Sequence, residues 1–153
     1  MPYKHTQISY MMLIITLTVL VLFAQAYITA SLEPESVNSG TNFAMTSIMI
    51  LIILIISSFI SLQVHIDDKY LRIKFGYGIF RKRFLLSDML SAKTVKNHRY
   101  YGWGIKVRFW PKMWIYSISG FDAVEIKMKN TKIYRIGTDE AKKLEQAILQ
   151  SIK

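Results

Sequence analysis

One stretch of the sequence combines residue types that often bind phosphate groups or nucleic acid. Residues 99–110, RYYGWGIKVRFW, hold aromatic and basic side chains together with Gly102 and Gly104. These glycines lack the third glycine and the strand–loop–helix context of a dinucleotide-binding loop, and no Gly-Lys-Ser/Thr follows them. A nucleotide site is therefore not indicated. We instead expect a loop before a strand, and its candidate interface residues for lipid or protein are Tyr100, Tyr101 and Trp103.

A second group of basic residues lies just after the apolar part of the chain. These residues alternate with apolar ones, which is typical of strands with one face in water. They could bind lipid headgroups, or they could serve membrane topology alone. Each cation adds up to about 1 kcal/mol of attraction to an anionic leaflet without any specific site. The candidate lipid- or anion-binding residues are Arg72, Lys74, Arg81, Lys82 and Arg83.

Residues typical of catalysis or metal binding are scattered along the chain. His5, His65 and His98 have no carboxylate or second histidine at the spacing of metal ligands, and Asp88 and Asp122 stand alone in sequence. The chain has no cysteine, which excludes a disulfide framework and a thiolate metal site. We therefore expect no enzymatic activity, no metal ion and no cofactor.

Two long apolar runs precede the basic part of the chain. One covers about residues 8–30 and the other about residues 43–62, and each reaches the roughly 20 residues that a helix needs to cross the hydrocarbon core. Both are rich in β-branched residues, but a backbone in lipid must satisfy its own hydrogen bonds, which favours helix. The connector, residues 31–42, holds turn formers and two acids. The sequence thus predicts a transmembrane α-hairpin.

The distribution of charge orients this hairpin. From Leu62 onward the chain holds 19 Lys or Arg against eight Asp or Glu, whereas the connector holds no Lys or Arg. By the positive-inside rule both termini face the cytoplasm of a cell whose inner membrane the hairpin spans. An alternative stays open, because Lys4, the apolar run and Ala24-Gln25-Ala26 are also compatible with a signal peptide cleaved after Ala26.

The pattern changes to strands after the second apolar run. Residues 71–75 alternate and are followed by Gly76-Tyr77-Gly78 and a second basic and apolar segment, which predicts a β-hairpin. In a later strand Ile105, Val107 and Phe109 are expected to point inward. Residues 124–128 and 133–136 predict another hairpin, with its turn at Asn130-Thr131.

The last element is predicted to be an amphipathic helix. Thr138 can cap its N-terminus, and Asp139 and Glu140 suit its first turn. Apolar residues then recur at intervals of three and four, as expected for a helix that lies on a sheet. This stripe consists of Ala141, Leu144, Ile148 and Ile152. Antiparallel strands followed by one helix predict an α+β domain.

Three sequence segments carry a resemblance to a known family: GWGIKV, WIYSISGFDAVEIKMKN and KIYRIGTDEAKKLEQAI. They resemble the bacterial pleckstrin-homology-like (PH-like) domains found behind two transmembrane helices in uncharacterised membrane proteins. The resemblance implies a bent antiparallel sheet or barrel closed at one end by the C-terminal helix. Eukaryotic pleckstrin-homology domains hold phosphoinositide headgroups with basic residues on their first two strands, a place comparable to the basic hairpin of this chain. The expected division is a transmembrane hairpin at 1–64 and a cytoplasmic PH-like domain at 65–153.

These observations lead to an expected function as a binding or scaffolding module at the membrane surface. Its partner is expected to be a membrane or cytoplasmic protein, bound at a sheet edge or beside the helix, or anionic lipid headgroups. The alternative is an accessory or regulatory subunit whose hairpin packs on a larger membrane complex. The sequence pI near 9.8 would fit nucleic acid in a soluble protein, but the apolar hairpin argues against that partner.

Overall fold

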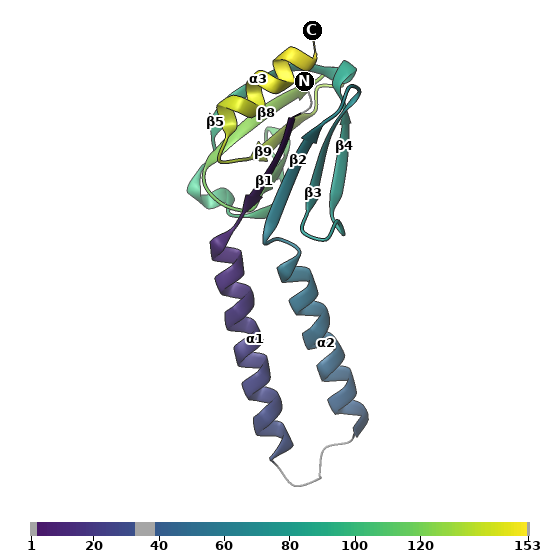
Figure 1. Cartoon of the computed structure of the whole chain (residues 1–153), viewed down its shortest axis with the longest axis vertical. Coiled ribbons are helices and arrows are strands. Elements are labelled where there is room, and N and C mark those ends of the chain that lie inside the picture. Colours follow the sequence, from purple (N-terminus) through teal and green to yellow (C-terminus); the bar gives the residue numbers. More distant parts are fainter. Residues whose placement is uncertain (1–2, 33–38, 153) are drawn as a thin grey trace.

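The computed structural model is an α+β structure with two apolar helices below two β-sheets and a C-terminal helix (Figure 1). It describes residues 3–32 and 39–152, so the middle of the predicted connector, residues 33–38, lies outside the described residues. The helices are α1 (Tyr10–Ser31), α2 (Ser39–Ser57) and α3 (Ala141–Ser151), with short 3-10 turns η1 (Leu86–Asp88) and η2 (Arg99–Tyr101). The strands are β1 (Tyr3–Ile8), β2 (Ser61–Ile66), β3 (Tyr70–Phe75), β4 (Arg81–Leu85), β5 (Met89–Lys96), β6 (Gly104–Phe109), β7 (Lys112–Ser117), β8 (Asp122–Met128) and β9 (Ile133–Gly137).

Helix α1 is the one described helix that is long and apolar enough to cross a membrane by length and composition. The apolar part of α2, Asn42–Ser57, is shorter. The sequence predicted the second span to continue to residue 62, but α2 ends earlier because its backbone tightens there. The Ser58 N–H approaches the carbonyls of both Leu54 and Ile55, and Ile60 bonds back to Ser57. Leu62, the last residue of the predicted span, belongs to the core of the domain instead, and Phe59 packs against this core.

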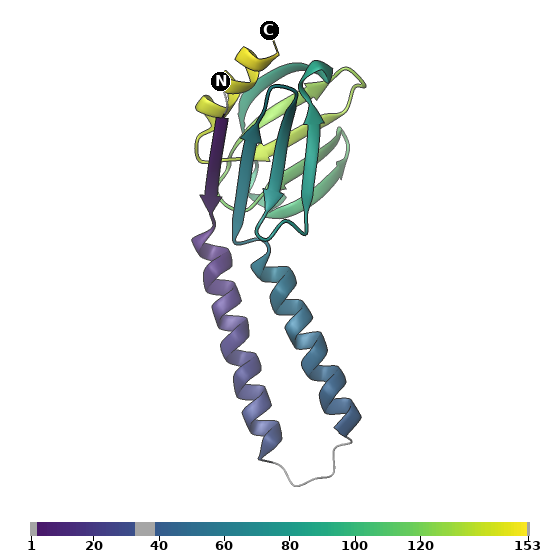
Figure 2. The same cartoon turned by 45° about the vertical axis from the view of Figure 1, so that its right-hand side comes forward.

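A strand that the sequence analysis did not predict, β1, precedes the first helix. It pairs antiparallel with β2, from Tyr3 opposite Ile66 to Ile8 opposite Ser61. The expected boundary between residues 64 and 65 therefore falls inside β2, and residues 3–8 belong to the same sheet as the strands that follow the helices. Figure 2 shows β1 and β2 leading directly into α1 and α2.

The first sheet has the order β1-β2-β3-β4 and packs one face on the core. Alternation along β2 and β3 turns every second residue inward, as expected for a strand with one wet face. The predicted hairpin of β3 and β4 is present, with its turn beside the end of α2. The inward residues of β2 and β3, together with Phe84 of β4, are at most 3% exposed: Leu62, Val64, Ile66, Leu71, Ile73, Phe75 and Phe84.

The second sheet has the order β5-β8-β9-β7-β6 and is mixed, because β7 and β9 run parallel. The sequence had predicted antiparallel strands only, and it had not identified β7 as the strand between β9 and β6. Residues 86–96 form both η1 and β5. The hairpin of β8 and β9 is present as predicted. The two sheets do not close into a barrel within the described residues.

Helix α3 covers β5 and β8 with the apolar stripe predicted from the sequence. Ala141, Leu144 and Ile148 are buried, while Ile152 follows the last turn and is half-buried. Thr138 lies just before the helix, where its Oγ1 accepts a hydrogen bond from the Glu140 N–H at 3.2 Å. The apolar stripe explains the position of this helix, because it buries one side against the sheet.

The β1–β2 pairing predicts that the apolar helices can be removed without loss of the domain. Ser9 donates its N–H to the Ile60 carbonyl at 2.7 Å, so a two-residue Asn-Gly loop in place of residues 10–59 would turn β1 and β2 into an ordinary hairpin. We expect this shortened chain to be soluble and to unfold cooperatively by circular dichroism. The control is residues 65–153 alone, which lack β1 and most of β2 and should not unfold cooperatively; equal behaviour of both would contradict the pairing.

The turn after β3 predicts a sensitive glycine at the junction with α2. Gly76 has φ +43°, and a Cβ there would lie 2.5 Å from the Ser58 carbonyl oxygen. Gly120 has φ +70° with open space around it, so it serves as the matched control. Alanine at Gly120 should lower the free energy of unfolding by about 1 to 2 kcal/mol, the cost of a left-handed non-glycine residue. Gly76→Ala should lower it distinctly further, as measured by thermal unfolding of the full chain in detergent; equal losses would rule out the clash.

Candidate functional site

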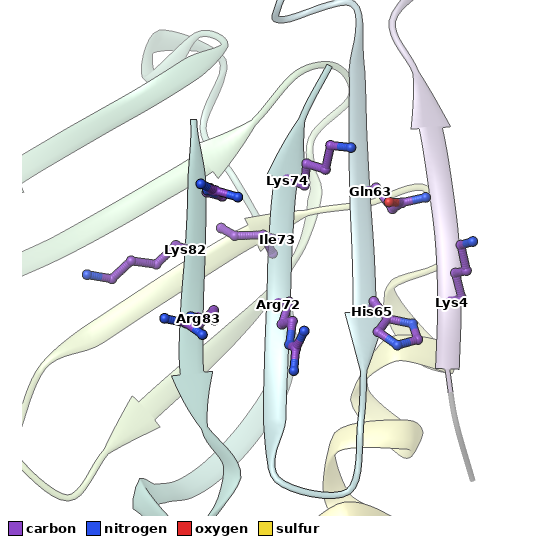
Figure 3. Close-up of a pocket in the computed structure, with 9 residues that line it drawn as sticks. Lys4, Gln63, His65, Arg72, Ile73, Lys74, Lys82 and Arg83 are labelled. Carbon is purple, nitrogen blue, oxygen red and sulfur yellow. The ribbon is translucent and has the colours of Figure 1, made fainter. Parts of the chain in front are cut away.

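The outer face of the first sheet carries a concentration of basic side chains. We call it the cationic face, and it consists of Lys4, Arg72, Lys74, Arg81 and Arg83. Alternation along the strands produces this arrangement, because Ile73 between Arg72 and Lys74 points inward to the core and Lys82 between Arg81 and Arg83 leaves the opposite side of β4. All five side chains are exposed, and they come from three different strands (Figure 3).

Strand register aligns these side chains in two rows across the sheet. In the row farther from the helices, Lys4 lies opposite His65, His65 opposite Arg72, and Arg72 opposite Arg83. In the row nearer the helices, Thr6, Gln63, Lys74 and Arg81 follow one another in the same way. Residues on one strand face repeat every second position, so the rows lie about 7 Å apart.

The face forms a hollow with little compensating negative charge. Its volume is about 820 Å³. Among the described residues, Asp67 is the acid within salt-bridge distance of this face, with its Oδ2 2.7 Å from Nη2 of Arg72 and its Oδ1 in contact with His65. The hollow is lined by Lys4, Gln63, His65, Arg72, Ile73, Lys74, Arg81, Lys82 and Arg83.

Like charges stand directly opposite each other in this arrangement. Arg72 faces Arg83 and Lys74 faces Arg81 on neighbouring strands. Such cross-strand pairs of like charge destabilise a sheet. A sheet that keeps two of them on one face is suited to bind an anion, because a phosphate or carboxylate between the rows would replace repulsion by charge-assisted hydrogen bonds.

The structure brings together most of the predicted anion-binding residues and adds one. Lys82 departs from the others because it lies opposite Ile73, whose side chain is buried, and so leaves β4 on the inner side. Figure 3 shows its side chain pointing away from the remaining cations. Lys4 was missed, since YKHTQI of β1 alternates polar residues on both faces and gives no apolar period.

The predicted interface loop is only partly available to a partner. Tyr100 is 71% exposed and Trp103 is half-buried, but Tyr101 is 7% exposed. Burial raises the pKa of Tyr101, and its hydroxyl accepts a hydrogen bond from Arg108. Tyr101 is therefore the least accessible of the three predicted interface residues. It belongs to a small apolar cluster on the outer face of the second sheet, with Met113, Ile115 and Ile133.

The strand after this loop also differs from the prediction. Ile105 is half-buried, but Val107 is 38% and Phe109 84% exposed, so the two latter residues do not enter the core. The reason is that β6 is an edge strand, and the inward side of its far end lacks cover from the first sheet. Trp110, in the turn to β7, is 88% exposed. The sequence analysis had not singled out Phe109 and Trp110 as exposed aromatics, although both lie in its opening stretch.

A second polar cluster joins β1 to the start of α3. His5 Nε2 lies 2.6 Å from Asp139 Oδ1, and its Nδ1 lies 3.3 Å from Glu140 Oε2. Burial raises the pKa of neighbouring Tyr3 to about 12, and both carboxylates add to this effect. The Tyr3 hydroxyl therefore stays protonated at neutral pH. In the part of the chain that the structure describes, no three His, Asp or Glu residues form a group that could hold a metal ion.

Comparisons with known proteins give no assignment: no family model, curated protein or solved structure matches the chain.

The like-charge pairs predict that removal of a cation stabilises the sheet. We expect Arg81→Gln to raise the free energy of unfolding by about 0.2 to 1 kcal/mol at low ionic strength. The gain should fade in about 1 M salt, where the Debye length falls to about 3 Å. Lys127→Gln is the control, because Lys127 is also exposed on a strand but lies opposite Ser91 and Ile133. Chemical unfolding of the full chain in detergent measures both; an equal or salt-independent effect would argue against repulsion.

Proposed function

We propose that the protein is a small integral membrane protein whose cytoplasmic domain is an anion-binding module at the membrane surface. The observation that carries this proposal is the cationic face, with two rows of cations on adjacent strands and one acid to compensate them. Its ligand carries phosphate groups, as anionic lipid headgroups do. The domain needs no recruitment, because it is joined to the helices without a linker.

The pairing of β1 with β2 supports a two-span arrangement. These strands precede α1 and follow α2, so the chain enters and leaves the helical region on the same side. If α1 crosses the bilayer, α2 must return. The Lys and Arg residues that closely follow α2, such as Lys69 and Arg72, then favour the cytoplasm for this side. Cleavage after Ala26 would remove β1, which argues against a signal peptide.

We keep the PH-like assignment as part of the proposal. It is supported by a bent two-sheet core with α3 as the last element, and by basic residues on an early hairpin. The parallel pair of β7 and β9 and the open edges depart from the expected closed antiparallel sheet. The proposed binding activity depends on the cationic face and not on this assignment.

The alternative function is that of an accessory subunit in a larger membrane complex. The apolar helices favour this accessory role to some extent, because only 6% of the most apolar stretch of α1 is buried within the chain. Such a surface fits lipid tails and partner helices equally well. A partner at fixed stoichiometry after purification in mild detergent would favour this second function.

Native mass spectrometry of the full chain tests the proposed function. In mild detergent with added phosphatidylglycerol or phosphatidylcholine, we expect the chain to retain phosphatidylglycerol preferentially. Arg81→Gln with Arg83→Gln should lower this retention about tenfold or more, since each cation near anionic lipid contributes about 1 kcal/mol.

The matched control removes the same charge from β8 and the turn that follows it, by Lys127→Gln with Lys132→Gln. This control should retain phosphatidylglycerol nearly as the unaltered chain does. Equal losses in both double variants would mean that net charge alone attracts the lipid, and the cationic face would then not be a site.

A further inference from the structure

Four strands form the edges of the two sheets, and three of them are protected. The backbone N–H of Thr94 on β5 donates to Glu145 of α3 at 2.9 Å. Hydrogen bonds from the side chain and the backbone of Thr94 lower the pKa of Glu145. On β1, Gln7 donates to the Ser119 hydroxyl at 2.7 Å. On β4, Lys82 points to the inner side, a charge that hinders pairing with another strand.

Strand β6 is the edge that lacks such protection among the described residues. Its inner side carries Val107 and Phe109, both exposed, in place of an inward charge. Its outer side carries Lys106 and Arg108. A second copy of the chain does not fit here, since antiparallel pairing of two β6 strands would set these cations against each other. The edge combines aromatic and basic residues, which is typical of a surface that contacts a membrane.

Side-chain contacts from β1 set the ends of β9 and β7 at different heights relative to the helices, and β6 lies beyond β7 in the sheet. His5 contacts Asp139, which follows β9, whereas Gln7, two residues nearer α1, contacts Ser119, which follows β7. The strands of the second sheet thus descend toward the helices in the order β9, β7, β6. Neighbouring strands lie about 4.8 Å apart, which brings the start of β6 to about the level where α1 begins.

Aromatic contacts between the sheets give the same order. Tyr134 of β9 packs on Phe84, with ring centroids 4.7 Å apart. Tyr116 of β7 contacts Phe84 and also Phe75, which lies at the helix end of β3. In both views the lower part of the second sheet lies just above the tops of the helices (Figures 1 and 2).

We propose that the open edge of β6 rests on the bilayer, as a docking surface for anionic lipid separate from the cationic face. Trp103 and Tyr100 at its start and Phe109 and Trp110 at its end enter the headgroup layer, and the exposed Lys106 meets lipid phosphates. Headgroups and water satisfy the unpaired backbone of the strand. This inference rests on the proposed membrane-spanning arrangement, which holds the edge at the bilayer.

The turn between β3 and β4 extends this surface on the side of α2. Tyr77 is 64% and Ile79 58% exposed, and the Tyr77 hydroxyl donates to Ser57 Oγ in the last turn of α2 at 3.0 Å. An exposed aromatic fixed to the end of an apolar helix is the usual position of an interfacial anchor.

Spin labels at single cysteines test the proposal in the full chain, which has no cysteine of its own. The labelled variants are Lys106→Cys and Phe109→Cys on β6, with Lys127→Cys on β8 as the control; all three positions are exposed. Each chain is reconstituted in vesicles of phosphatidylcholine and phosphatidylglycerol. We expect both β6 labels to be less accessible to a neutral nickel chelate, and more accessible to oxygen, than the control label.

The proposal is wrong if either β6 label is as accessible to the nickel chelate as the Lys127→Cys label. Flotation and alkaline extraction of the same vesicles distinguish a failure of the docking edge from a failure of the proposed function. A chain that resists extraction but has water-exposed β6 labels contradicts the docking edge alone. A chain that alkali extracts from the vesicles contradicts the proposed function, and the docking edge with it.

Discussion

Ser9 donates its backbone N–H to the Ile60 carbonyl, and from this bond β1 and β2 run side by side away from the helices. The bond connects the start and the end of the helical hairpin, so that both apolar helices join the same sheet. No linker separates helix from strand at either end, since α1 begins two residues after β1 and the tight turn after α2 leads into β2. The orientation of the domain therefore follows from the orientation of the helices, and the sheet edges and charged faces have fixed heights above them.

The first sheet divides its residues between two opposite requirements. Its inner face is aliphatic and aromatic and supplies much of the main core, while its outer face holds cations opposite cations. The first arrangement stabilises the domain and the second weakens it, because like charges on neighbouring strands repel. A structural role alone would be met equally well by polar neutral residues. The retained repulsion is therefore best understood as the free-energy cost of a surface prepared for an anion.

Local patterns in the sequence were sufficient to predict those elements whose apolar residues recur with the period of the element and so form one buried face. This applies to the β3–β4 and β8–β9 hairpins and to the stripe of α3. Local patterns failed where tertiary contacts determine the structure. Strand β1 has no apolar period and forms because β2 lies beside it. Strand β6 has an apolar period, but no other element covers its far end. Leu62 is equally apolar whether it enters lipid or core, so composition could not locate the end of α2. Most cations of the candidate site were identified, but the row that includes Lys4 depends on register between strands separated by the whole hairpin.

The position of β1 also has a consequence for biosynthesis. This strand is made before the two apolar helices, whereas its partner β2 follows after them. In the proposed arrangement β1 can pair only if the hairpin inserts with both ends on one side. A chain inserted with β1 across the membrane would leave β2 paired with β3 alone and open its other edge. Folding of the domain thus acts as a check on membrane insertion, and misinserted chains would present an open strand edge that quality-control proteases and chaperones recognise.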